Sequence, residues 1–402
     1  MVRPERRTKV DVLVVGLIVV TALVVGAVSW HTGDLRATTL RTASEPAEVP
    51  APPTGLPPSL AEVWSAPSPA TDRPAVAGPS VVVGAGSAVR GLDPFSGEER
   101  WSYERDLPLC TVGAQWDRAV AVYRKSRNCS EVTSLEGDTG ERGPQRNTDA
   151  EPGTSLLGDG TYLTATGRHI TEVWGSNLVR TLQYGRVPAL VNPDRQPRVD
   201  CEHRAFAAGE ARLAVIERCA EDANERLTVL SARPEDNDEP EEDFSVPLDE
   251  ADAALVATSD VFTVIATPSP PTLTVYDSEG LRTDHFPLPF TGEQFAESTS
   301  SVPLTTITDE HVFWHAGGST AALSAEDGRL LWTMSETMGA GTSFAGVLLV
   351  PVPDGLAVLD PATGERLGDF PVDRGDHDGP IVMDSIGPIL LEQRGDTLVA
   401  LR

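Results

Sequence analysis

The hydrophobic positions form one long apolar run near the start of the chain and many short runs after it. Val12 to Trp30 contains no charged residue. As a helix this run is about 28 Å long, close to the hydrocarbon thickness of a bilayer. From about residue 60 the apolar runs are short, rich in β-branched residues and separated by acidic or glycine-containing turns. This pattern predicts one transmembrane helix over residues 12–30, followed by an all-β domain.

The charges beside the apolar run predict its orientation. Four basic residues precede it: Arg3, Arg6, Arg7 and Lys9. Asp34 is among the first charges beyond it, so the positive-inside rule places residues 1–11 in the cytoplasm and exports the rest. A cleaved signal peptide is the alternative, because Ala27-Val28-Ser29 resembles the small-residue cleavage pattern. Both interpretations export the body of the protein.

Residues 31–59 predict a linker. The segment is rich in Ala, Thr, Ser and Glu, and its prolines include Pro50, Pro52, Pro53, Pro57 and Pro58. Such a composition buries little apolar surface and favours semi-extended chain. We therefore expect a tether that holds the following domain off the membrane surface.

An internal repeat dominates residues 60–402. An apolar strand ending in Leu or Val is followed by an acidic turn, with Gly five residues after that Leu or Val. Five copies share this spacing: Leu92 to Trp101, Leu135 to Arg142, Val275 to Gly280, Leu323 to Trp332 and Leu359 to Arg366. Asp or Ser opens such a turn, and Gly accepts the positive φ that closes it. Each copy is therefore predicted to join the third and fourth strands of one unit.

The Leu-Asp-x-x-x-Gly-x-x-x-Trp pattern resembles the repeat of the PQQ-like β-propeller family, and the resemblance covers residues 60–402. That family includes the quinoprotein dehydrogenases and the outer-membrane assembly lipoprotein BamB. The resemblance implies a β-propeller and leaves the activity open, because one fold hosts many functions. Four tryptophans that recur at blade positions are expected to fill gaps between blades: Trp64, Trp101, Trp174 and Trp332.

The repeat predicts eight blades. Five are clear, near 82–106, 119–145, 261–288, 312–336 and 347–373, and two weaker ones lie near 161–174 and 213–230. The chain ends on two apolar strands, 389–391 and 397–401, without the turn and fourth strand that should follow. Ala61 to Trp64 reads as that missing strand, and closing the ring with both chain ends removes exposed edges. Seven blades is the alternative, because residues 186–260 are degenerate.

The four cysteines of this exported domain predict two structural disulfides, Cys110 with Cys129 and Cys201 with Cys219. Each pair brackets an apolar run, and pairing of the first strand with the end of the second would bring the sulfurs together. Metal binding is the competing interpretation, but the sequence has no CxxC motif to support it.

Charge and missing motifs limit the function. The 32 basic and 60 acidic residues give a net charge of -28, which repels nucleic-acid phosphates. The adjacent cysteines that contact the cofactor in quinoprotein dehydrogenases are absent from the sequence, as is a haem attachment motif. We therefore expect no catalytic residue, cofactor or metal, and a non-enzymatic scaffold or sensor for an unidentified protein of the cell envelope. The alternative is an envelope enzyme or ligand-binding protein with its site in the central channel.

Overall fold

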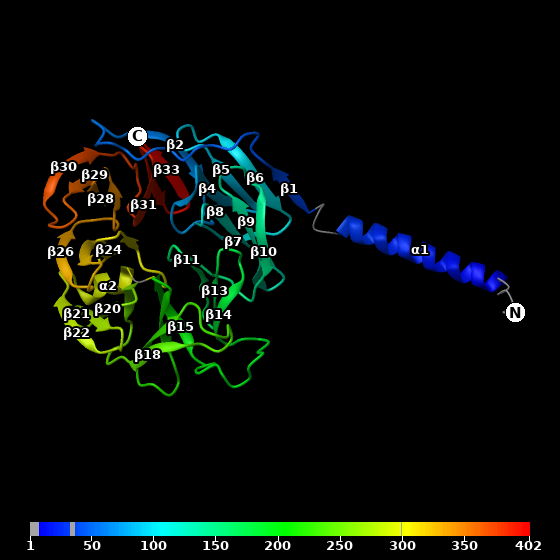
Figure 1. The fold of residues 1–402 in the computed structure, drawn as a ribbon. Coiled ribbons are helices and arrows are strands. Elements are labelled where there is room, and N and C mark those ends of the chain that lie inside the picture. The colour runs from blue at the N-terminus through cyan, green and yellow to red at the C-terminus, as the bar shows by residue number, and fades with distance from the viewer. Residues whose placement is uncertain (1–7, 33–36, 299) are drawn as a thin grey trace.

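The computed structural model describes residues 8–32, 37–298 and 300–402, and Figure 1 shows one long helix projecting from a ring of sheets. Helix α1 (Lys9–Thr32) begins at a capping box, in which Thr8 and Asp11 exchange hydrogen bonds between side chain and backbone N–H. Residues 9–30 have a mean hydropathy of 2.8 and bury none of their apolar window against the rest of the chain. The helix is therefore long and apolar enough to cross a membrane.

Eight sheets, each an antiparallel meander, form the ring. We number them as blades in chain order. Blade 1 contains β3 (Ala75–Ala77), β4 (Ser80–Ala85), β5 (Ala88–Leu92) and β6 (Glu99–Arg105); blade 2 contains β7 (Leu109–Gln115), β8 (Arg118–Lys125), β9 (Asn128–Glu136) and β10 (Arg142–Asn147). Blade 3 contains β11 (Leu156–Gly158), β12 (Leu163–Ala165), β13 (Ile170–Trp174) and β14 (Arg180–Gly185); blade 4 contains β15 (Glu202–Gly209), β16 (Arg212–Arg218), β17 (Glu225–Ser231) and β18 (Glu242–Pro247).

The other half of the ring repeats the same order. Blade 5 contains β19 (Ala254–Thr258), β20 (Phe262–Pro268), β21 (Pro271–Asp277) and β22 (Arg282–Pro287); helix α2 (Gly292–Ser298) follows it. Blade 6 contains β23 (Thr305–Ile307), β24 (His311–Ala316), β25 (Ser319–Ser324) and β26 (Leu330–Ser335). Blade 7 contains β27 (Thr342–Phe344), β28 (Val347–Val352), β29 (Gly355–Leu359) and β30 (Arg366–Pro371). Blade 8 contains β31 (Ile381–Ile386), β32 (Ile389–Arg394), β33 (Thr397–Leu401) and β2 (Glu62–Pro67).

Blade 8 confirms the eight-bladed prediction and the closure of the ring. Strand β2 pairs with β33, placing Trp64 opposite Ala400. Ala61 and Arg402 also exchange backbone hydrogen bonds of 2.9 Å beside this ladder. The last blade therefore contains strands from both ends of the propeller, and the seven-bladed alternative is wrong.

The repeated turn joins the third and fourth strands of its blade, as predicted. Its glycine lies in the left-handed region in all five copies, with φ between 70° and 78°. Beside three of these turns lies a tryptophan from the fourth strand of the preceding blade. Trp64, Trp101 and Trp332 donate Nε1–H to the carbonyl oxygens of Pro94, Gly137 and Pro361, each at 2.9 Å. We call this arrangement the Trp–turn contact. Trp174 differs, because it lies on the third strand of blade 3 and donates to Glu172.

The antiparallel meander divides the propeller into two faces. Turns between first and second strands, and between third and fourth strands, lie on one face, which we call the turn face. In blade 2 the two kinds of turn contact each other, since Gly137 N–H donates to the carbonyl of Asp117 at 3.0 Å. The second-to-third-strand turns and the links between blades lie on the opposite face, the connection face.

The segment predicted as a linker contains a strand. Strand β1 (Thr38–Arg41) pairs antiparallel with β6 and makes blade 1 five-stranded. The chain then crosses the turn face, where Ala43 N–H donates to the carbonyl of Thr139 at 2.9 Å. Farther on, Pro50 lies against Gly387 in a turn of blade 8, close enough that a Cβ on that glycine would meet the Pro50 Cβ at 2.5 Å. Much of residues 38–61 therefore contacts the propeller, unlike the free tether expected from composition.

Candidate functional site

The innermost strands of the blades line a central channel with a cavity of about 220 Å³. Its wall consists mainly of small or apolar side chains, because Ala, Val, Gly and Thr recur on these first strands. Three charged residues are among those that line it: Asp72, Arg73 and Asp384. Burial raises the pKa of Asp384 to about 6, although the Arg73 guanidinium opposes this shift. The channel therefore combines a weakly polar wall with one basic group and two acidic groups.

The chain after α2 crosses part of this channel. The Ser301 carbonyl accepts a 2.8 Å hydrogen bond from Phe206 N–H on the innermost strand of blade 4. The Pro303 carbonyl accepts one of 3.3 Å from Arg73 Nη2, which belongs to the link before blade 1. In Figure 1 helix α2 lies on the inner side of the ring. Residues from blade 4, the link between blades 5 and 6, and the link before blade 1 therefore meet within the channel.

A second cavity, of about 410 Å³, opens on the turn face beside the channel and spans blades 3 to 6. It shares four lining residues with the channel: Gly158, Ala208, Ala257 and Ile307. We call this cavity the turn-face groove. Its floor includes Phe262 and Val312, while Ile307 at its edge is 55% exposed. The groove therefore offers apolar surface at the mouth of the channel.

Acidic residues of successive turns edge this groove. Asp159 in blade 3 accepts a 3.0 Å hydrogen bond from the N–H of Ala211, in the corresponding turn of blade 4. Glu210 in blade 4 accepts one of 3.2 Å from the N–H of Asp260, in the corresponding turn of blade 5. Asp309 continues the series in blade 6. Each contact joins neighbouring blades, and together the carboxylates give the groove a negative potential.

The chemistry of the two cavities suits binding. Their described lining residues contain carboxylates, hydroxyls, amides and Arg73, without a histidine, cysteine or lysine. Carboxylates and hydroxyls of this kind can hydrogen-bond a bound ligand. An apolar floor with an acidic edge fits a segment that carries apolar and basic side chains.

The structure pairs the cysteines as the sequence predicts. Cys110 is bonded to Cys129 and Cys201 to Cys219, across separations of 19 and 18 residues. Cys110 lies on the first strand of blade 2 at a bulge, and Cys129 begins the third strand rather than ending the second. The second disulfide joins the residue before β15 to the residue after β16. No lining residue of the channel or the groove belongs to either disulfide.

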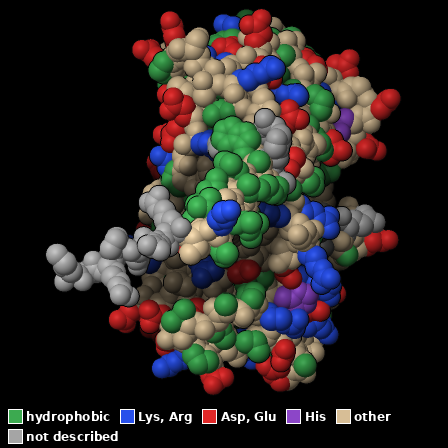
Figure 2. Space-filling model, turned by 90° about the vertical axis from the view of Figure 1, so that its right-hand side faces the viewer, with side chains coloured by type: hydrophobic (Ala, Val, Ile, Leu, Met, Phe, Trp, Pro, Cys, Tyr) green, Lys and Arg blue, Asp and Glu red, His purple; other side chains and the backbone are tan. Residues whose placement is uncertain are grey.

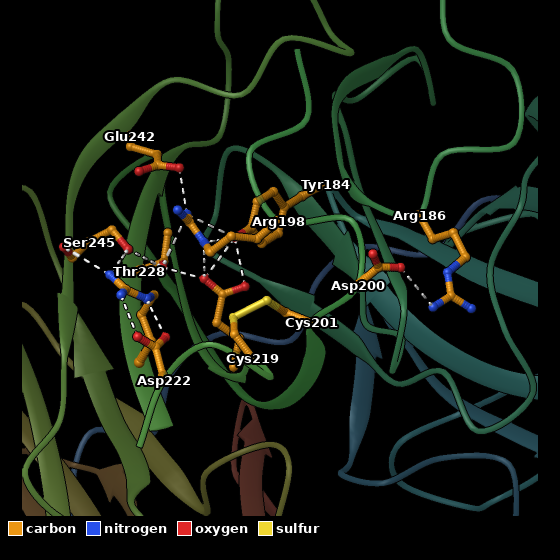
Figure 3. The surroundings of a disulfide bond; sticks show 12 residues. Tyr184, Arg186, Arg198, Asp200, Cys201, Cys219, Asp222, Thr228, Glu242 and Ser245 are labelled. Atoms are coloured by element: carbon orange, nitrogen blue, oxygen red, sulfur yellow. Dashed lines mark hydrogen bonds and ion pairs between the residues drawn. A yellow bond between two sulfur atoms is a disulfide. The ribbon is translucent and has the colours of Figure 1, made fainter. Parts of the chain in front are cut away.

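A buried ionic network lies beside the second disulfide (Figure 3). Arg198 Nε donates to the fully buried Glu217 at 2.7 Å, and the Tyr184 hydroxyl donates to the same carboxylate at 2.8 Å. Arg198 also bonds to Glu242 on the outer strand of blade 4. Burial raises the pKa of the Tyr184 hydroxyl, so it remains a hydrogen-bond donor. The network fastens the long link between blades 3 and 4, which is a structural role.

The acidic run at residues 235–243 occupies most of the turn between β17 and β18 and the first two residues of β18. One of its members does not extend into solvent: Asp238 is 3% exposed and accepts hydrogen bonds from the backbone N–H groups of Val191 and Asn192. These bonds help lower the pKa of Asp238 against the effect of its burial. The run therefore supports the blade 3–4 link as well as carrying exposed charge.

The groove is not evident from the sequence. Its acidic residues lie in separate turns, and each one taken alone is typical of a solvated turn. Aligning the turns between first and second strands of blades 2 to 6 would have shown an acidic side chain in every one: Asp117, Asp159, Glu210, Asp260 and Asp309. Their common position in the repeat is the signal that could have found the site.

Comparisons with known proteins identify the fold. No protein-family model and no curated protein matches the sequence. Among solved structures, BamB from Moraxella catarrhalis matches with a TM-score of 0.52 and 15% identity, covering 85% of this chain and 99% of that one. Sqt1 from Saccharomyces cerevisiae matches with a TM-score of 0.52 and 9% identity, covering 85% and 98%. The chain thus has the β-propeller fold, with BamB among its structural neighbours.

Proposed function

We propose that this protein is a single-pass membrane protein whose propeller lies outside the cytoplasm and acts as a non-enzymatic scaffold or sensor for another envelope protein. The apolar helix α1 and the basic residues before it support the anchoring and its orientation. The two disulfides support an oxidising compartment. The resemblance of the repeat to a family that includes an outer-membrane assembly lipoprotein supports a role in protein binding.

The observation that carries this proposal is the turn-face groove. It places exposed Ile307 next to acidic turns of blades 3 to 6, around a cavity large enough for several side chains. A partner segment with alternating apolar and basic residues would bury its apolar side chains against the exposed Ile307. Its basic side chains would then pair with Glu210 and Asp309, which gives specificity and faster association. We therefore assign partner binding to this groove.

Site-specific photo-cross-linking in intact cells tests the binding site. A photoreactive residue replacing Ile307 should cross-link one discrete partner. Leu367 on β30 is the matched control, because it is also 55% exposed but lies on the outer strand of blade 7. Combining the Ile307 replacement with Glu210→Lys and Asp309→Lys should remove the adduct, since both substitutions reverse charge at the groove. The same adduct from Leu367, or no adduct from Ile307, would overturn the assignment.

A reporter fusion tests the topology separately. Alkaline phosphatase joined after residue 60 should be active, because that enzyme needs export to form its disulfides. The same reporter joined after residue 8, before the apolar run, should be inactive and serves as the control. An inactive fusion at residue 60 with normal expression would contradict export of the propeller.

A further inference from the structure

Strand β1 brings the propeller close to the end of the membrane helix. α1 ends at Thr32, and Ala37 is already fixed to blade 1, because its carbonyl accepts a 3.0 Å hydrogen bond from Asp106 N–H. Five Cα steps span at most about 18 Å. A free linker over residues 31–59 would instead have a root-mean-square length of roughly 30 Å and could extend much farther. The attachment at β1 therefore confines blade 1 to the vicinity of the bilayer.

The pairing of β1 shows which face of the propeller is near the helix. Thr38 lies opposite Arg105, the last residue of β6, so the chain arrives at the end of β6 that leads into the link to blade 2. Links between blades lie on the connection face. The Pro108 carbonyl in the same link accepts a 2.9 Å hydrogen bond from Arg124 N–H. The link between blades 1 and 2 therefore bonds to the chain that follows α1 and also to the hairpin between β8 and β9.

This hairpin concentrates positive charge in a very acidic protein. Arg124, Lys125 and Arg127 are all exposed around its tip. Lys125 pairs with Glu131, which also binds Arg105. Arg124 and Arg127 form no ion pair with any residue that the structure describes. Figure 2 views the side from which α1 projects and shows Lys and Arg side chains, together with some Asp and Glu, around the apolar side chains at its centre.

The base of the hairpin is held rigidly. Cys129 follows Asn128 directly and is bonded to Cys110 on β7, the strand on the other side of β8. The buried Arg105–Glu131 pair, at 2.8 Å, fastens the same strand to blade 1 two residues farther on. Two exposed carboxylates, Glu104 and Asp106, lie near the end of β6, so favourable contact with an anionic surface is confined to the hairpin tip.

We infer that the hairpin Arg124–Asn128 binds anionic phospholipid headgroups of the bilayer that α1 crosses, and so turns the connection face of blades 1 and 2 toward the membrane. A net charge of -28 is repelled by such a bilayer in most orientations. The hairpin provides the orientation in which unpaired cations face the lipid. The turn-face groove then points away from the membrane, where a partner can reach it. This inference rests on the proposed anchoring through α1 but not on the groove.

Hydrogen–deuterium exchange of the full chain in lipid nanodiscs tests the inference. Discs of phosphatidylcholine alone are compared with discs in which one third of the lipid is phosphatidylglycerol. Exchange at residues 124–128 should be slower in the anionic discs by about fivefold or more, since one basic residue near an anionic surface contributes about that factor. The difference should disappear in Arg124→Glu/Arg127→Glu, whose melting temperature checks its fold.

Arg329→Glu/Arg366→Glu is the matched control, because it makes the same charge change at two exposed arginines following the repeated turns of blades 6 and 7. It should retain the slow exchange in anionic discs. Equal exchange of the wild-type hairpin in both discs, or persistent slowing in Arg124→Glu/Arg127→Glu, would overturn the inference alone. Loss of the chain from the discs would overturn the anchoring and the inference with it.

Discussion

At the scale of single residues, the propeller depends on glycines that serve two purposes. Gly97, Gly140 and Gly364 adopt positive φ to close their own turns, and they leave room for a tryptophan of the preceding blade. A Cβ on Gly140 would lie 2.6 Å from the Trp101 side chain. The Trp–turn contact therefore links neighbouring copies of the repeat, because the tryptophan of one blade packs on the glycine of the next blade.

Substitution of Gly140 tests this coupling. Gly140→Ala should lower the free energy of unfolding by the cost of a left-handed residue, about 1–2 kcal/mol, plus about 1–3 kcal/mol for overpacking against buried Trp101. Gly153→Ala is the matched control, because φ there is 87° and no atom lies within 4 Å of the added Cβ. Chemical unfolding of both variants measures the difference, and equal losses would show that the tryptophan adds no constraint at this turn.

At the scale of elements, the sequence pattern predicts strands that pack on both faces and misses those that do not. The long apolar runs and the glycine turns locate the second, third and fourth strands of most blades. Strand β1, with the sequence Thr-Thr-Leu-Arg, is largely exposed and pairs with one neighbour, β6, so it carries no alternation that would separate it from a linker. Its position depends on a partner about 65 residues away, which local pattern cannot show.

The disulfides are elements whose pairing can be tested directly. Mass spectrometry without reduction should find Cys110 linked to Cys129 and Cys201 linked to Cys219. Replacing both cysteines of either pair by serine should lower the free energy of unfolding by roughly 3 kcal/mol, because each bond closes a loop of about 20 residues in the unfolded chain. Free thiols, or bonds between the two pairs, would contradict the arrangement of strands in blades 2 and 4.

At the scale of the whole molecule, the fold was more predictable than the site. The ring and its closure follow from a repeat whose Leu, acidic residue and Gly recur at one local spacing in five copies. The groove depends on Asp159, Glu210 and Ile307 meeting across three blades. The channel likewise depends on Arg73 lying near Pro303, 230 positions away. Such contacts arise from the closed geometry of the ring, so they become visible only after the blades are assembled.

Closure of the ring gives the final prediction. Removing residues 1–59 should leave a folded, soluble propeller, because β2 still pairs with β33. Removing residues 1–68 also deletes β2 and leaves β33 as an open edge with buried Leu398, Val399 and Leu401 beside it. Unpaired backbone groups and newly exposed apolar side chains favour aggregation. The longer deletion should therefore lower the melting temperature strongly and reduce the soluble fraction in sedimentation.

Trp64→Ala in the variant lacking residues 1–59 separates the contribution of the Trp64 indole from that of the β2–β33 hydrogen bonds. This substitution keeps the β2–β33 ladder but removes the indole that packs on Gly97 and donates to Pro94. It should cost about 2–3 kcal/mol, the burial energy of a large side chain, without causing aggregation. If the two deletions have equal melting temperatures and equal solubility, closure through β2 does not stabilise the ring. If Trp64→Ala aggregates as the longer deletion does, the indole rather than the strand ladder protects the edge.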